Sequence, residues 1–196
     1  MFSSILRRNK GTALIEFCFI LPLLVIMVLF IIDFGRLIQA RIIITNVTRE
    51  GGNLASRDIK TGNDLISMLQ SSAAPLDLQQ SGRICISSIE AGFNQNNPDP
   101  FISVQDPQLC RGSLNVQSGI SSGATHLGLT DDLYNHLVFD DTNQASDIDG
   151  VTVVETFYIY RPITPLPRFI ANIFLTDGDG TIIGSRAVFC TTSVGG

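Results

Sequence analysis

The sequence predicts an α+β protein in which a long hydrophobic N-terminal helix precedes a small antiparallel sheet domain. Three features of the 196 residues carry this prediction. Residues 12–32 form an apolar run that is long enough to cross a bilayer as a helix. Residues 151–160 are rich in β-branched and aromatic side chains, as is typical of a strand. Residues 93–123 are rich in Asn, Pro, Ser and Gly, which favours loops between strands.

The charge is distributed unevenly along the chain. The formal net charge is −5, yet the first eleven residues are basic, with Arg7, Arg8 and Lys10. Residues 64–196 carry 14 acidic and 5 basic side chains. A basic flank next to an apolar span is typical of the cytoplasmic side of a membrane. The acidic remainder argues against nucleic-acid binding, because phosphates are met by clustered Lys and Arg.

The apolar run from Thr12 to Ile32 admits three interpretations. As a helix with a rise of about 1.5 Å per residue, it spans about 30 Å, the thickness of the bilayer core. A cleaved secretory signal would have a shorter apolar stretch followed by a small-x-small site, and Ile38-Gln39-Ala40 fits such a site poorly. We therefore expect an anchor, either a plain one or one that also assembles a filament.

Glu16 distinguishes the two kinds of anchor, because it is the charged residue inside the apolar run. A carboxylate near one end of a membrane span costs about 2–3 kcal/mol and so indicates a function. If the chain is cut after Gly11, Thr12 carries the new amine and Glu16 becomes the fifth residue. In a filament the acid of one subunit would neutralise the amine of a neighbour inside an apolar bundle. The alternative is that Glu16 lies in the headgroup zone without a function.

A combination of short motifs surrounds these positions. They are Gly11 before the expected cut, Glu16-Phe17, Leu21-Pro22, the aliphatic run, Ile32-Asp33-Phe34-Gly35-Arg36, Ala40-Arg41 and Thr48-Arg49-Glu50-Gly51. Together they resemble the N-terminal signature of the TadE-like pseudopilins of tight-adherence (Tad, or Flp) pili. Ordinary type IV pilins share the glycine cut and the acid at position five, but they usually lack the Leu-Pro and Asp-Phe-Gly-Arg blocks. Pro22 is also expected to kink or loosen the helix, because proline removes a helical hydrogen bond.

The resemblance implies a pilin-like fold and the role of a minor pseudopilin in pilus initiation or biogenesis and surface adhesion. It implies cleavage by a prepilin peptidase between Gly11 and Thr12. The assembly residues would be Glu16, Phe17 and Pro22. The membrane-flank motif would consist of Asp33, Phe34, Gly35 and Arg36. The implied partners are other pilins and pseudopilins of the same pilus, the peptidase, the inner-membrane assembly platform and the lipid bilayer.

The resemblance also implies an organisation along the chain. A cleaved leader would occupy residues 1–11 and a transmembrane and assembly helix residues 12–36. A periplasmic continuation of the helix would occupy residues 37–75, and a periplasmic α+β domain residues 76–196. The protein would then be a single-pass protein of the bacterial inner membrane that can enter an extracellular pilus.

Local patterns predict further elements beyond the apolar run. The helix should fray or bend near Gly51-Gly52, because glycine is a poor helix former. Strands are expected at 82–91, 101–104, 151–160 and 181–191, and the last two would pair across a surface flap. Short helices are expected at 65–69, 129–139 and 168–175, and a turn at 177–180.

Of the four cysteines, Cys18 lies in the apolar run and the others in the polar part of the chain. Their spacings match no zinc pattern. In an oxidising periplasm, Cys85 and Cys110 are the favoured disulfide pair, because the long polar loop between them gains about 3 kcal/mol from closure. Cys190 would then stay free. Three reduced cysteines remain an alternative, since sequence alone does not determine connectivity.

No catalytic constellation is visible in the sequence, so we expect neither enzyme activity nor a cofactor or metal. His126 and His136 fit surface or partly buried positions better than a metal site. Residues 177–180 match part of a calcium loop without its first and last acids. The acidic segment 140–149 would hold calcium only if it folded back on itself. The main alternative function is therefore an uncleaved, membrane-anchored periplasmic or surface adhesin that binds calcium.

Overall fold

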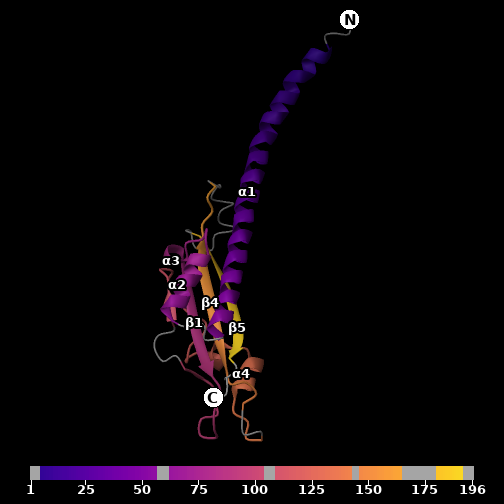
Figure 1. Ribbon diagram of the computed structural model, residues 1–196. Helices are drawn as coiled ribbons and strands as arrows, with labels where there is room; N and C mark the ends of the chain where they lie inside the picture. Colours follow the sequence, from indigo (N-terminus) through magenta and orange to yellow (C-terminus); the bar gives the residue numbers. More distant parts are fainter. Residues whose placement is uncertain (1–4, 57–61, 104–108, 143–145, 165–179, 192–196) are drawn as a thin grey trace. The chain divides into compact units, whose positions relative to one another are not determined.

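The computed structural model describes residues 5–56, 62–103, 109–142, 146–164 and 180–191 (Figure 1). The chain divides into two compact units. The first comprises residues 1–39 and 161–181, and the second comprises residues 40–160 and 182–196. The expected helix at 168–175 and most of the expected turn at 177–180 lie outside the described residues.

Helix α1 (Ile5–Ser56) begins in the first unit and ends in the second. Pro22 lies inside this helix, which continues on both sides of it. The helix also continues through Gly51-Gly52, so the fraying expected there is not found. Within the expected continuation over residues 37–75, the described residues contain the end of α1 and a second helix, α2 (Asn63–Ser72).

The two glycines near the end of α1 allow the helix to approach its neighbours closely. A Cβ atom on Gly51 would lie 2.7 Å from a methyl carbon of Leu69 on α2. A Cβ atom on Gly52 would lie 2.3 Å from two ring carbons of Phe189. The two glycines at which fraying or bending was expected are therefore contact residues, and tertiary packing overrides their low helix propensity.

The sheet of the second unit has five strands: β1 (Gly82–Glu90), β2 (Phe101–Ile102), β3 (Leu109–Arg111), β4 (Gly150–Tyr160) and β5 (Thr181–Thr191). Their order is β2-β1-β4-β5, with β3 also paired to β1. Strand β1 is antiparallel to β2, β3 and β4. The strands expected at 82–91, 151–160 and 181–191 are confirmed, as is a short one at 101, and β4 and β5 are neighbours as expected.

Successive side chains of β1 and β4 point to opposite faces of the sheet, and each face has its own core. One core contains Ile84 and Val154 with side chains from the C-terminal part of α1 and from α2, which lie beside the sheet in Figure 1. Its buried helix residues are Ile44, Val47, Leu65, Ile66 and Leu69. The other core contains Ile89, Val151 and Val153 with side chains of the loops and of α4 (Asp131–Leu137).

A disulfide joins Cys85 to Cys110, the pair that the sequence analysis favoured. The two residues are direct partners in the β1–β3 register, with their Cα atoms 4.1 Å apart. The bond closes a loop with a sequence separation of 25, which stabilises the fold by about 3 kcal/mol on the chain-entropy estimate. Strand β3 has only three residues, so this bond holds it on the sheet edge.

A buried carboxylate attaches the long loop after β3 to the sheet. Glu155 on β4 is 5% exposed. It accepts hydrogen bonds from the hydroxyl of Ser118 and from the backbone N–H of Gly119. Its Oε1 atom lies 3.3 Å from Nε of Arg186 on β5. Arg186 also donates from Nη1 to the carbonyl of Gly128 at 2.9 Å, so the charge pair of Glu155 and Arg186 contacts this loop at two separate points.

The contact between Gly52 and Phe189 can be tested by replacing Gly52 with Ala. The added methyl group is expected to cost about 1–3 kcal/mol of unfolding free energy, because it overfills a packed contact. The matched control is Asn53→Ala, since Asn53 is exposed on the next position of the same helix. Denaturant unfolding of the detergent-solubilised full chain, followed by near-UV circular dichroism, measures both. A Gly52→Ala variant as stable as Asn53→Ala would contradict this packing.

Candidate functional site

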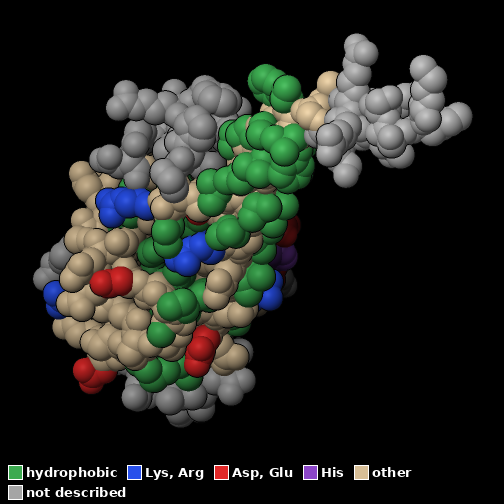
Figure 2. Space-filling model, turned by 90° about the horizontal axis from the view of Figure 1, so that it is seen from above, with side chains coloured by type: hydrophobic (Ala, Val, Ile, Leu, Met, Phe, Trp, Pro, Cys, Tyr) green, Lys and Arg blue, Asp and Glu red, His purple; other side chains and the backbone are tan. Residues whose placement is uncertain are grey.

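The candidate site is the N-terminal half of α1, whose surface is almost entirely apolar. The segment has a mean hydropathy of 3.0 over its most apolar window, and none of that window is buried by the rest of the chain. Phe19 is 78% exposed, and Leu14 and Ile31 exceed 60%. Figure 2 shows hydrophobic side chains gathered along the described part of the helix. By length and composition, α1 can serve as a single-pass membrane anchor.

The residues around the expected cleavage point lie on consecutive turns of this helix. A Cβ atom on Gly11 would meet no atom within 4 Å, so no described residue from elsewhere in the chain packs against the helix at that point. Thr12 and Glu16 are four residues apart and so share one face of the helix. The Glu16 side chain is exposed, and it has no hydrogen-bond or ion-pair partner among the side chains that the structure describes. Phe17 beside it is 57% exposed.

Pro22 has no N–H group, so the carbonyl of Cys18 lacks its usual helical partner. Both residues are exposed on α1, and the Cys18 thiol is free. The structure thus shows a continuous helix with one missing hydrogen bond in the middle of its apolar run.

The membrane-flank motif begins where the apolar run ends. Asp33 is 6% exposed. Its Oδ1 atom accepts a hydrogen bond from the backbone N–H of Ile163 at 3.1 Å, and its Oδ2 atom accepts one from the hydroxyl of Thr164. Phe34 stacks on Phe30, with ring centroids 6.1 Å apart. The contacts of Asp33 with Ile163 and Thr164 could not be predicted from the sequence, because no local pattern indicates a contact over about 130 positions.

Residues 11–53 match the family model described as TadE-like protein. The N-terminal segment of this chain is TadE-like. The match begins at Gly11, includes Glu16 and Pro22, and ends on the last turn of α1. No curated protein and no solved structure matches the chain.

Outside the TadE-like segment, the two histidines each face an acid. Nδ1 of His126 lies 2.8 Å from Oδ1 of Asp131, and Nδ1 of His136 lies 2.6 Å from Oδ2 of Asp147. The hydrogen bond with Asp147 is the main cause that raises the pKa of His136 above its usual 6.5. Both histidines are partly or fully exposed, in agreement with the surface positions expected from the sequence.

The described residues contain no group of three or more His, Cys, Asp and Glu side chains that could hold a metal ion. In the acidic loop, the Asp140 carboxylate accepts hydrogen bonds from the N–H and the hydroxyl of Thr142. These hydrogen bonds lower the pKa of Asp140. The loop thus forms a local turn in its described part, and calcium binding by it gains no support.

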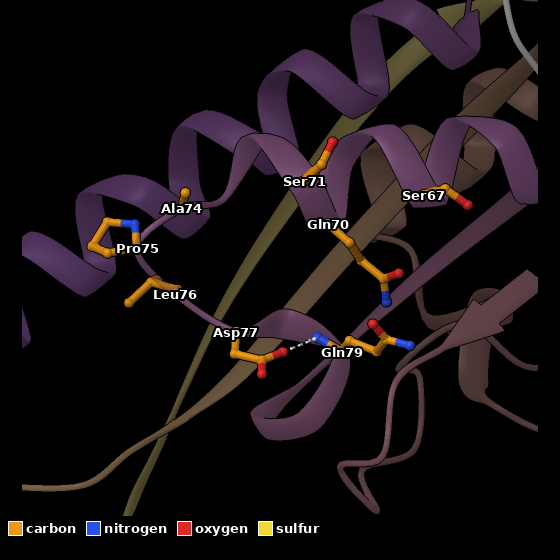
Figure 3. Close-up of a pocket in the computed structure, with 8 residues that line it drawn as sticks. All are labelled: Ser67, Gln70, Ser71, Ala74, Pro75, Leu76, Asp77 and Gln79. Atoms are coloured by element: carbon orange, nitrogen blue, oxygen red, sulfur yellow. Dashed lines mark hydrogen bonds between the residues drawn. The ribbon is translucent and has the colours of Figure 1, made fainter.

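A shallow cleft lies between α2 and α3 (Leu78–Ser81) and is lined mainly by polar side chains (Figure 3). Asp77 caps α3 by accepting hydrogen bonds from the N–H groups of Gln79 and Gln80 at 3.1 and 2.9 Å. The hydroxyls of Ser67 and Ser71 donate to carbonyls of their own helix. These polar groups therefore serve the fold, and the described lining pairs no nucleophile with a base.

The raised pKa of His136 predicts a pH-dependent contribution to stability. Protonated His136 stabilises the fold fully below its usual pKa of 6.5, and this contribution is lost as the pH rises through the higher pKa of the folded state. His136→Gln should therefore lower Tm more at pH 5.5 than at pH 8.5. Asp147→Asn should show the same pattern, because it removes the partner. Thermal unfolding with equal Tm losses at the two pH values would contradict the pairing.

Proposed function

We propose that this chain is a minor pseudopilin of a tight-adherence pilus, acting in pilus initiation or biogenesis. One observation supports this proposal. The TadE-like match over residues 11–53 coincides with an apolar helix whose most apolar window contains no buried residue among those described. An exposed surface of this kind is stable in lipid or in a bundle of similar helices. A protein that is assembled into a pilus would move such a helix from the lipid into the helix bundle.

The proposed precursor has a leader of residues 1–11, which a prepilin peptidase removes on the cytoplasmic side. The basic residues of the leader hold it on that side of the membrane. The helix over residues 12–36 then crosses the inner membrane, and the sheet domain lies in the periplasm. The disulfide between Cys85 and Cys110 supports this placement, because disulfides persist in oxidising compartments.

The proposed assembly step moves α1 from lipid into the helix bundle of the pilus. Between helices in lipid there is little hydrophobic driving force, so packing and polar contacts decide the register. Cleavage after Gly11 would give Thr12 a charged amine one helical turn before Glu16. In the bundle, the Glu16 carboxylate of one subunit would pair with the amine of its neighbour. Each charge alone would be costly there, and the pair is tolerable.

The role of Glu16 is tested by Glu16→Ala in the native host. Removing one partner of a buried charge pair costs about 3–5 kcal/mol, so pilus number should fall by about tenfold or more. Membrane insertion should persist, because the substitution makes the helix more apolar. Pili are counted by electron microscopy, and insertion is measured by carbonate extraction.

Asp64→Ala is the control, since Asp64 is an exposed acid on α2 outside the matched segment. It should leave pilus number unchanged. Normal piliation by the Glu16→Ala strain, with the protein still in the membrane, would overturn the assembly role. That result would favour the anchored adhesin, which has no need of Glu16.

A further inference from the structure

The contact of Asp33 fixes a second segment at the end of the apolar run. Asp33 directly follows Ile32, the last residue of the run, so it lies at the outer end of a span of about 30 Å. Its two carboxylate oxygens accept hydrogen bonds from Ile163 and Thr164. Residues 1–39 and 161–181 belong to the same compact unit, so this depth does not depend on where the sheet domain lies.

The environment of Asp33 suits a membrane boundary. A carboxylate that faced the edge of the hydrocarbon core without partners would be costly. Here it is 6% exposed and receives two hydrogen bonds, one from a backbone N–H and one from a hydroxyl. Hydrogen bonds to an ionised acceptor are among the stronger ones in proteins. The segment that covers Asp33 therefore sits where the bilayer surface must be.

The covering segment presents an apolar side chain and a cation to its surroundings. Ile163 is 65% exposed, and Arg161 is exposed two residues before it. Arg36, one turn beyond Asp33 on α1, is also exposed. At a membrane surface, apolar side chains enter the boundary between headgroups and acyl chains, while arginine side chains extend toward phosphates.

We propose that residues 161–164 form a lipid-contact segment at the periplasmic surface of the membrane. Ile163 enters the headgroup boundary, and Arg36 and Arg161 contact phosphates of anionic phospholipids. Asp33 is the positioning residue that holds the segment at this depth. The proposal rests on α1 crossing the membrane, as in the proposed function, but it requires no filament assembly.

The test uses the full-length chain in vesicles of phosphatidylglycerol and phosphatidylcholine. Cys18 and Cys190 are replaced by Ser, and a single cysteine at position 163 is labelled with the environment-sensitive fluorophore NBD. Cys85 and Cys110 are joined in the disulfide and stay unlabelled. Quenching by lipids with a nitroxide on carbon 5 of the acyl chain then reports the depth of the label.

The same label at position 24 or at position 93 provides reference values of quenching inside the membrane and away from it. Leu24 lies inside the apolar run and is 48% exposed. Phe93 follows the end of β1 that pairs with Gly150, which is the end of β4 remote from Tyr160. We expect strong quenching at 24 and at least about twofold more quenching at 163 than at 93, because interfacial side chains insert about 5–10 Å. Equal quenching at 163 and 93 would overturn the proposal.

Two further variants separate positioning from lipid contact. Asp33→Ala should reduce quenching at position 163 while leaving position 24 unchanged. Arg36→Gln combined with Arg161→Gln should reduce quenching at 163 in phosphatidylglycerol vesicles and have little effect in pure phosphatidylcholine. Unchanged quenching in the Asp33→Ala chain would remove the positioning role. Absence of quenching at Leu24 would refute the membrane span itself, and so both this inference and the proposed function.

Discussion

The apolar surface of α1 is the constraint on which the other features of this protein depend. Among the described residues, none in the most apolar window of α1 is buried. Burial of apolar surface is worth about 25 cal/mol per Å², which favours covering this helix with lipid or with other helices. The position of each polar group along the helix then determines how costly its burial in an apolar environment is. Glu16 lies near one end of the run, and Asp33 follows the other end and is enclosed by Ile163 and Thr164.

The same helix changes character after the apolar run. In the second unit, Ala40, Ile44 and Val47 are buried, and Ile44 and Val47 belong to a core that includes sheet residues, whereas the residues between them are more exposed. Gly51 and Gly52 then bring the helix backbone close to Leu69 and Phe189. One helix thus has the length and composition of a membrane span along its first half and is part of the core of the sheet domain along its second half.

Local composition was sufficient to predict the apolar helix and the long strands. Strand β4 was the clearest case, because ten consecutive residues from Val151 to Tyr160 favour a strand. The helix after Thr130 was also predicted correctly, although the Thr130 side chain makes no capping hydrogen bond. The TadE-like signature was recognisable from motifs that lie within one helix.

Several features that depend on distant residues could not be predicted, in contrast to the disulfide between Cys85 and Cys110. Strand β3 has three residues with no pattern of their own, and it is held by pairing with β1 and by the disulfide. The role of Glu155 in attaching the loop after β3 could not be predicted, because its partners Ser118 and Arg186 are 37 and 31 positions away. Fraying or bending was expected at Gly51-Gly52 because helix propensity is local, whereas the contacts that favour glycine there are tertiary.

The position of the N-terminus in the mature protein decides whether α1 is processed into an assembly helix. The measurement is the intact mass and N-terminal sequence of the protein purified from membranes of its native host. If the helix is processed for assembly, the mature chain begins at Thr12, with Glu16 as its fifth residue. A chain that begins at Met1 would contradict processing and leave a permanent anchor, and a chain that begins near Arg41 would show that the helix is a signal peptide.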